Sequence, residues 1–447
     1  MKIFFTIMLG IALILPLYSQ EAENKTDESA AEHSIENEAA DGENSEGSSE
    51  LEPQKKKKDF ARKYFEIGID TGAGFDNGLA NMSDILQKNI VVDLSKLAQG
   101  IPDNGIDLDF SPNADFFINI KNITIGEGLW DFGISSNIDG GINANISKSL
   151  FTLISEGNID QHNSSGSISV SGGIFTDISL KGSAKYKIED KPLYAGIKMS
   201  IFTPAVYIPS NSGVSYYLTS KKDGNEGIFV NTKGEINVYT PTSLENADPG
   251  RFFIGPSGFD ISLEGEYPLF PFLDVGGSLT NIPFAAATLT NLMKLSMTEF
   301  DIALSGDDLI AGKNPEIPPV DFNKTYDDSV EFKVYRLLRF DIYARYKPFN
   351  SEFLVIRPNI GFSANVNKDD EKGYFNIGLE TRLNLINMFT FYIGTGYLEN
   401  IWKHKAGFNL NFRAFELDLE AALRDQTFAG AFEGRGLNLN LGLRFGW

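Results

Sequence analysis

The sequence predicts an all-β fold, a transmembrane antiparallel β-barrel of about 14 strands, within a range of 12 to 16. Three observations predict it: an apolar N-terminal segment typical of a secretion signal, the absence of cysteine in 447 residues, and many segments that alternate apolar and polar residues with a period of two. No apolar run after the N-terminal segment is long enough for a membrane-spanning helix. The mean hydropathy of −0.16 is also too low for a bundle of such helices.

The first 58 residues are predicted to lie outside the barrel. Residues 1–19 form the predicted signal peptide, with Lys2 as the positive end, an apolar run up to Leu17, and the small residue Ser19 at the cleavage point. Residues 20–58 form a predicted disordered linker, because they hold almost no large apolar residue. Twelve acids and one lysine in residues 21–54 carry about half of the net charge of −21. We interpret the basic run 55–58 as solvated linker, with binding to anionic headgroups as the alternative.

Residues 59–447 form the predicted barrel. In the last segment, alternate residues from Leu437 to Trp447 are apolar, whereas Asn438, Asn440 and Arg444 lie between them. Alternation of this kind predicts a strand with one face in lipid. One segment, 167–189, reads as a strand of about 22 residues, which weighs against a soluble β-sandwich or β-solenoid, where strands are short. The same alternation recurs in segments 193–201, 338–346, 354–366, 389–397, 408–412 and 415–423.

A barrel whose last residue lies at the periplasmic face has a predictable topology. Counting back from the C-terminus places loops 425–436, 399–405 and 368–373 outside, and turns 347–352 and 387–388 inside. Charged, longer loops outside and tight turns inside are the pattern expected of such barrels.

Three segments have apolar residues at mixed helical spacing and predict short helical insertions: 81–99, 146–156 and 283–295. The first has Ser83 as a cap and Gly100 as a stop. Its apolar residues Ile85, Leu86, Val92 and Leu97 make it a candidate hatch that closes the pore, with a packed connection as the alternative.

The last eight residues carry a family resemblance. Asn440, Gly442, Phe445 and Trp447 match the polar, glycine, aromatic and aromatic positions of the C-terminal signal of bacterial outer-membrane β-barrels, which this segment resembles. The resemblance implies that the strand is recognised by the barrel-assembly machinery. Independently, a terminal indole on the lipid face is favoured at the membrane–water interface.

Composition and motifs predict no enzyme, no cofactor and no metal site. Without cysteine there are no disulfides and no thiolate-bound metals, and the excess of acids disfavours nucleic acid. Of the three histidines, His33 falls in the linker, His162 in a polar loop, and His404 in a predicted outer loop between two lysines. No metalloprotease, nucleophile-elbow or complete phosphate-binding motif occurs. We interpret the acids at 307, 308, 327 and 328 as solvated rather than calcium-binding.

Two functions remain. The first is passage of small or hydrophobic solutes, as in a porin or a fatty-acid transporter. The signal peptide, the N-terminal helical region, the long strands and the abundant phenylalanine are similar to the long-chain fatty-acid transporter family, which implies a path for hydrophobic ligands. Ser111 to Ala114 shares letters but not order with that family's Asn-Pro-Ala element, so no ligand residue is carried over.

The alternative function is a structural or surface-exposed adhesin or antigen barrel, whose longest outer loop would be 305–331. Either function predicts a location in the outer membrane of a diderm bacterium. The expected partners are outer-membrane lipid, the assembly machinery and periplasmic chaperones. The sequence leaves the oligomeric state open.

Overall fold

The computed structural model describes residues 64–78, 101, 103, 105–149, 164–188, 191–222, 225–244, 249–252, 255–297, 300–302, 322–367, 370, 372–386 and 388–447. The predicted signal peptide, the linker and the candidate hatch, with Ile85, Leu86, Val92 and Leu97, lie outside these residues. Within the described ranges, no helix has both the length and the apolar character needed to cross a membrane.

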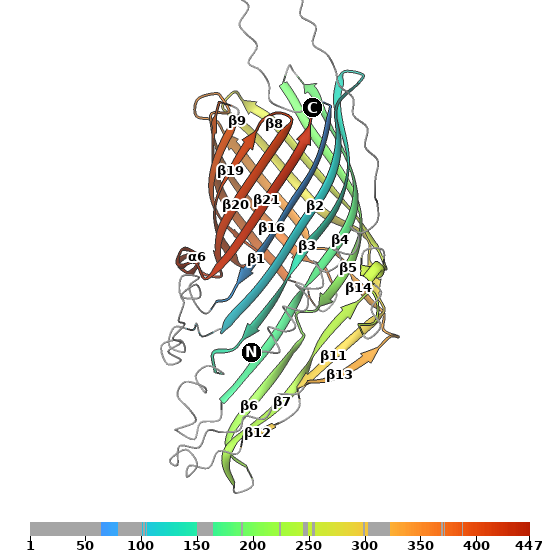
Figure 1. Cartoon of the computed structure of the whole chain (residues 1–447), viewed down its shortest axis with the longest axis vertical. Helices are drawn as coiled ribbons and strands as arrows, with labels where there is room; N and C mark the ends of the chain where they lie inside the picture. The colour runs from blue at the N-terminus through green and yellow to red at the C-terminus, as the bar shows by residue number, and fades with distance from the viewer. Residues whose placement is uncertain are drawn as a thin grey trace, which may run out of the picture. The chain divides into compact units, whose positions relative to one another are not determined.

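The described strands pair in a closed antiparallel ring, so the predicted barrel and its strand number of about 14 are confirmed (Figure 1). The ring follows chain order except where β8 follows β5 and β15 follows β9. It closes between the first and last strands, where Glu66 lies opposite Gly446 and Asp76 opposite Gly436. The members in order are β1 (Phe65–Asp76), β2 (Ile106–Ile125), β3 (Gly128–Ile146), β4 (Ser164–Ile188), β5 (Lys191–Ile208), β8 (Gly258–Phe270), β9 (Leu273–Ala285), β15 (Leu338–Tyr346), β16 (Leu354–Asn365), β17 (Lys372–Leu385), β18 (Phe389–Leu398), β19 (Ile401–Asn411), β20 (Phe415–Asp425) and β21 (Gly436–Gly446).

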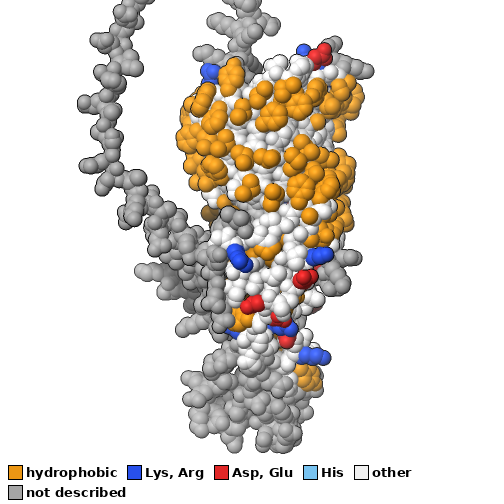
Figure 2. All heavy atoms as spheres, turned by 90° about the vertical axis from the view of Figure 1, so that its right-hand side faces the viewer, with side chains coloured by type: hydrophobic (Ala, Val, Ile, Leu, Met, Phe, Trp, Pro, Cys, Tyr) orange, Lys and Arg blue, Asp and Glu red, His pale blue; other side chains and the backbone are white. Residues whose placement is uncertain are grey.

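The alternation in sequence becomes an apolar outside and a polar inside. In β21, Leu439 is 54% exposed and Phe445 52%, whereas Asn438 is 7% exposed. On the face shown in Figure 2, hydrophobic side chains cover the upper part of the barrel in a broad belt, with charged groups below it and a few at its upper rim. A broad apolar belt on a closed barrel indicates that lipid surrounds it, because exposing so much apolar surface to water would be unfavourable in free energy. The fold is therefore a transmembrane β-barrel.

The two ends of the barrel differ. The turn end, at the top of Figure 1, carries the C-terminal residue and the tight turn at Gly126 and Glu127. Aromatic side chains gather there, including Trp447, whose ring centroid lies 4.9 Å from that of Phe65. Others are the pairs Phe415–Phe445 and Phe270–Phe272. Such a ring of aromatics is typical of the edge of the membrane.

At the opposite, loop end, part of the wall continues beyond the barrel. β4 is 25 residues long, and its first residues pair with β6 rather than with β5. The sheet then continues through β7 and β11 to β13. This extension lies at the lower end of Figure 1 and consists of β6 (Gly213–Lys222), β7 (Asn225–Thr240), β11 (Asn291–Met297), β12 (Phe300–Ile302) and β13 (Phe322–Asp327).

Glycine permits a sharp bend in the wall between β3 and β4. Gly140 and Gly172 have φ of 126° and 127°, in the region that favours glycine. A Cβ on either residue would overlap a backbone carbonyl of the facing strand, that of Gly173 or Gly141. Next to this bend, the β4–β5 register shifts between Ile174 and Phe175. A bulge of this kind increases local twist, which helps the wall to leave the cylinder.

A short pair of strands turns inward where the barrel meets the extension. β10 (Ala287–Leu289) pairs with β14 (Phe332–Val334) as a separate two-stranded sheet. Leu289 and Val334 are fully buried and pack with Tyr207 of β5, with Phe175, Tyr239 and Phe332 around them. We call this group the junction core. It joins β4, β5 and β7 to the short strands β10 and β14 at the loop end.

The helix predicted over 283–295 is wrong, because this segment forms the end of β9, then β10 and the start of β11. Its backbone groups are satisfied by pairing with distant strands, which overrides the helix propensity of the alanines. In the predicted insertion 146–156, Ile146 ends β3 and residues 148–149 are helical, whereas 150–156 lie outside the described residues.

Two predicted outer loops also need correction. Most of loop 399–405 belongs to β19, because Glu399 and Asn400 take positive φ and form a two-residue turn. Loop 425–436 contains the helix α6 (Phe428–Glu433), which Thr427 caps at its N-terminus. Part of the predicted loop 305–331 is strand β13, and residues 303–321 lie outside the described residues.

Candidate functional site: a charged cavity inside the barrel

A cavity of about 480 Å³ lies inside the barrel near the turn end. Its lining comes from the inward-facing positions of neighbouring strands, where polar residues alternate with outward-facing Ile, Leu and Phe. Val355 is the one aliphatic side chain among the lining residues, which are Glu266, Tyr343, Arg345, Glu352, Val355, Arg357, Arg382, Asn384, Thr390, Tyr392, Lys405, Asn409, Glu416, Asp418, Glu420 and Arg444. Inward-facing residues of β8 and of β15 to β21 therefore meet in one place.

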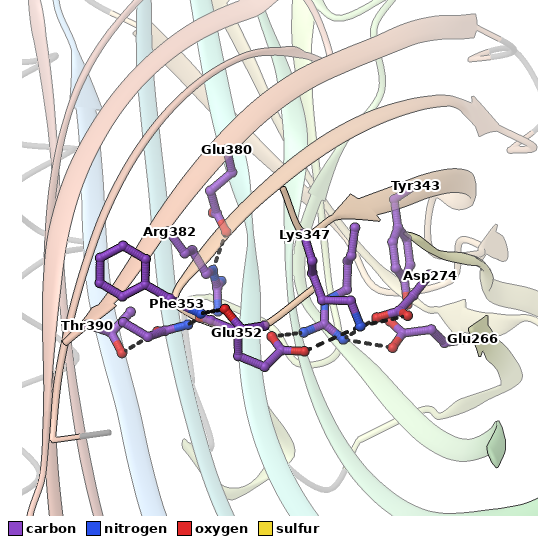
Figure 3. Close-up of polar contacts among 12 residues, drawn as sticks. Glu266, Asp274, Tyr343, Lys347, Glu352, Phe353, Glu380, Arg382 and Thr390 are labelled. Atoms are coloured by element: carbon purple, nitrogen blue, oxygen red, sulfur yellow. Dashed lines mark hydrogen bonds and ion pairs between the residues drawn. The ribbon is translucent and has the colours of Figure 1, made fainter. Parts of the chain in front are cut away.

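An ion-pair network closes the wall of the cavity toward the turn end (Figure 3). Arg345 lies 2.8 Å from Glu266 and 2.8 Å from Glu352, and it also contacts Asp274 at 3.3 Å. Lys347 lies 2.9 Å from Asp274 and 3.6 Å from Glu352. Each charge has more than one partner, so the side chains are held in a fixed arrangement.

A second network lies on the strands that follow. Glu380 accepts from Arg382 and, at 2.6 Å, from Lys405. Glu420 lies 3.3 Å from Lys405 and 3.2 Å from Lys403. Three cations thus share two carboxylates on the inner face of β17 to β20.

The inner face next to the barrel seam has a third network. Arg444 lies 2.8 Å from Glu416 and 3.1 Å from Asp70 of β1. Asp418 accepts from the Tyr392 hydroxyl at 2.8 Å and from Asn409 at 3.1 Å. Neutral groups thus donate the hydrogen bonds to Asp418, whereas Glu416 and Asp70 share the guanidinium of Arg444.

Toward the loop end, buried ion pairs of an arginine connect the segment between β14 and β15 to the barrel wall. Arg336 follows β14 and is 4% exposed. Its guanidinium donates to both carboxylate oxygens of Asp260, at 2.7 and 2.8 Å, and also to Asp177. The Phe202 ring lies 5.1 Å from the guanidinium carbon. This cluster joins the segment between β14 and β15 to β4, β5 and β8.

The loop between β16 and β17 adds two contacts to the same level. Asn367 accepts from the backbone N–H of Tyr335 at 2.6 Å and donates to its carbonyl at 2.9 Å. The Tyr207 hydroxyl of the junction core donates to Asp370 at 2.6 Å. Tyr207 belongs to β5 and Asp370 precedes β17, so this bond links strands that four members of the ring separate, namely β8, β9, β15 and β16. At this level, side chains of β5 and of the segment after β14 are therefore tied to the loop between β16 and β17.

The outer face has a groove of its own. It measures about 710 Å³, and its exposed lining includes Ile342, Ile360 and Leu379, with Trp402 and Phe428 of α6 at its loop end. Apolar side chains on the lipid side are expected to contact acyl chains.

The structure places the four residues of the predicted assembly signal as the alternation requires. Phe445 and Trp447 lie on the outer face, 52% and 68% exposed. Asn440 points inward and donates to Glu420 at 2.9 Å. Gly442 is also inward, and a Cβ there would overlap the Asp70 carboxylate. Their role in assembly stays a prediction.

Sequence reasoning missed the inward lysines of β19. Residues 403–405 were expected in a solvated outer loop, yet Lys403 and Lys405 face the cavity. Between them, His404 is 9% exposed on the outer face, where its ring stacks at 3.8 Å on that of Phe432. Its ring nitrogens contact the Thr395 hydroxyl and the Phe428 carbonyl. The alternation continues through this segment and would have found it, had the charges not suggested a loop.

Among the described residues, no group of three or more His, Asp or Glu side chains is arranged to hold a metal ion. Asp327, one of the predicted solvated acids, accepts hydrogen bonds from Ser329 in the extension.

Comparison with known proteins gives no family model and no curated protein that matches the chain. Among solved structures, it is similar to a deletion mutant of the monoaromatic hydrocarbon channel TodX, with a TM-score of 0.44 and 10% identity over 87% of this chain and 92% of that one. It is also similar to the Ralstonia pickettii toluene transporter TbuX (TM-score 0.37, 10% identity, 87% and 90%) and to a Pseudomonas aeruginosa FadL homologue (TM-score 0.37, 8% identity, 86% and 90%). Since these TM-scores are below 0.5, the similarities establish neither family nor function for this chain.

Proposed function

We propose that this protein is an outer-membrane channel for small solutes in a diderm bacterium. The observation that carries the proposal is the charged cavity of about 480 Å³ inside a closed barrel with an apolar outer belt. Charged groups in a barrel interior are stable when they are paired or hydrated. Water that hydrates such a lining also provides a path for polar solutes.

The proposed orientation has the turn end in the periplasm and the loop end outside the cell. Outer-membrane lipid surrounds the apolar belt, and periplasmic chaperones and the barrel-assembly machinery deliver the chain. Since the sequence has no cysteine, single cysteines can test this cleanly. A membrane-impermeant maleimide should label Lys233→Cys of β7 in intact cells, and Arg413→Cys of the turn before β20 only after the cells are opened. The reverse pattern would invert the orientation.

Conductance tests the channel itself. The protein, refolded without residues 1–58, should give steady current steps in planar bilayers, because its interior is hydrated. Vesicles that carry it should admit small sugars and amino acids faster than empty vesicles do. A barrel that is folded, as judged by its heat-dependent gel mobility, but passes neither ions nor solutes would refute the channel.

Two alternatives have support from particular features. The apolar outer groove beside Trp402 favours passage of hydrophobic solutes, which saturable displacement of a fluorescent fatty acid would reveal. The junction core and the buried ion pairs of Arg336, which link several strands at the loop end, favour a non-transporting surface barrel. The absence of both current and displacement would indicate this alternative.

A further inference from the structure

Arg357 differs from every other cation of the cavity. It lies on the inner face of β16, between Ile356 and Pro358, which face outward. The four other cations that line the cavity each have a carboxylate partner within 3.3 Å; they are Arg345, Arg382, Lys405 and Arg444. Arg357 forms no ion pair or hydrogen bond with the part of the chain that the structure describes.

Two carboxylates near Arg357, Glu380 and Glu266, already have other partners. Glu380 lies directly opposite it in the β16–β17 ladder. One oxygen of Glu380 accepts from Arg382 and the other from Lys405. Glu266, beyond Tyr343, accepts from Arg345 with one oxygen and from Tyr343 with the other. Both oxygens of Glu380 and of Glu266 are therefore paired without Arg357.

The Arg357 guanidinium is nevertheless held in place. Its carbon lies 4.0 Å from the centroid of the Tyr343 ring, an arrangement that favours the cation on the ring face. The Tyr343 hydroxyl donates to Glu266 at 3.0 Å, and Arg345 fixes Glu266 in turn. This contact with the Tyr343 ring holds the guanidinium without a hydrogen bond, and its N–H groups have no acceptor among the described residues. A guanidinium presents these donors in a fork that matches a carboxylate.

The lining of the cavity is balanced in charge, with five carboxylates and five cations among its side chains. Every one of these cations except Arg357 has a carboxylate partner. The guanidinium of Arg357 is therefore the cation of the lining that remains available to an anionic solute.

We propose that Arg357 binds the carboxylate of a small organic anion in the lumen. The inference rests on the proposed channel function, and it specifies a carboxylate-bearing solute as the class that the channel favours. Tyr343 acts as a positioning residue that holds the plane of the guanidinium, and the paired charges around it keep the site rigid.

Equilibrium dialysis with radiolabelled benzoate tests the site on the refolded barrel in nanodiscs. Benzamide serves as the neutral analogue of nearly the same shape. The wild type should bind benzoate saturably and benzamide at least about tenfold more weakly, since charge-assisted hydrogen bonds contribute about 1.5–3 kcal/mol. Arg357→Gln should lose about tenfold or more in benzoate affinity, whereas Arg413→Gln, which removes the same charge from an exposed turn, should bind as the wild type does.

Arg357→Lys keeps the charge and removes the fork, so it should bind with intermediate affinity; it also replaces Arg357→Gln if that variant does not fold. Equal binding of benzoate and benzamide, or unchanged benzoate binding in the Arg357 variants, would overturn the inference. In planar bilayers, benzoate should reduce the current of the wild type and not that of Arg357→Gln. If benzoate binding depends on Arg357 but the protein carries no current in planar bilayers, the anion site is retained and the channel function is refuted.

Discussion

Replacing Arg336 with methionine tests how the barrel is fastened at its loop end. Methionine keeps the length of the side chain and removes its charge. The guanidinium donates to Asp260 at 2.7 and 2.8 Å and to Asp177, whose side chains are 2% and 1% exposed. Without it, two buried carboxylates remain, with Lys198 at 3.7 Å from Asp177 as the nearest cation.

The expected cost is large. Removing one partner of a buried ion pair typically destabilises a protein by about 3–5 kcal/mol, because the remaining charge stays buried without compensation. The loss of the Phe202 contact at 5.1 Å adds to this in the same direction. We therefore expect Arg336→Met to lower the free energy of unfolding by about 3–5 kcal/mol. Neutralising both acids as well, by Asp177→Asn and Asp260→Asn, should recover part of it.

The assay is denaturant unfolding of the barrel in phospholipid vesicles, followed by tryptophan fluorescence in both the unfolding and refolding directions. Arg435→Met is the matched control, because Arg435 pairs with Glu433 at 2.8 Å on an exposed surface, where an ion pair contributes about 0–1 kcal/mol. The reasoning would be refuted if Arg336→Met and Arg435→Met had the same small effect, or if the triple variant were less stable than Arg336→Met alone.

Three further predictions concern the bend, the junction core and the last residue. Gly172→Ala should destabilise the barrel by about 1–3 kcal/mol, because φ of 127° is strained for alanine and its Cβ meets the Gly141 carbonyl. Gly182→Ala is the control, because there is room for a Cβ at that position. Equal melting temperatures of the two variants would contradict the expected strain. Leu289→Ala should lower the free energy of unfolding by about 2–5 kcal/mol in denaturant, because the side chain is fully buried. Leu439→Ala on the lipid face should lower it less. A larger loss for Leu439→Ala would contradict the expected contribution of the junction core. Trp447→Ala should reduce the amount of folded protein in the outer membrane of cells, whereas refolding in vitro, followed by gel mobility, should stay largely intact. A similar loss in cells and in vitro would mean that the contact of Trp447 with Phe65 stabilises the barrel itself.

The alternation predicted the faces of the strands well where a strand runs straight through the membrane. In β21, the apolar set of Leu439, Leu441 and Phe445 lies outside, as the period of two requires. The prediction failed where strands change partners. Segment 283–295 bends inward between two sheets, so its apolar residues follow neither a strand nor a helix period, and pairing with β14, β7 and β13 decides its structure.

The charges of β19 show a different limit. Lys403 and Lys405 predict a solvated loop, because lysine is rarely buried without a partner. Their partners, Glu380 and Glu420, come from β17 and β20, on either side of β19. Sequence alone places lysine and glutamate on inner faces, but it does not reveal that they lie at the same height in the barrel.

By itself the sequence determined the class of fold and the division of each straight strand into a lipid face and a lumen face. These properties depend on the period of the backbone, which is local. Only the tertiary structure decided the closure of the ring and the partners of the charges, because both depend on register between distant strands. Arg444 meets Asp70 across the seam, 374 residues away in the chain, whereas Arg357 stays without an acid although Glu380 lies opposite it. This difference between Arg444 and Arg357 follows from which strands are neighbours. It is the reason that Arg357, among the inward-facing arginines, is a candidate binding group.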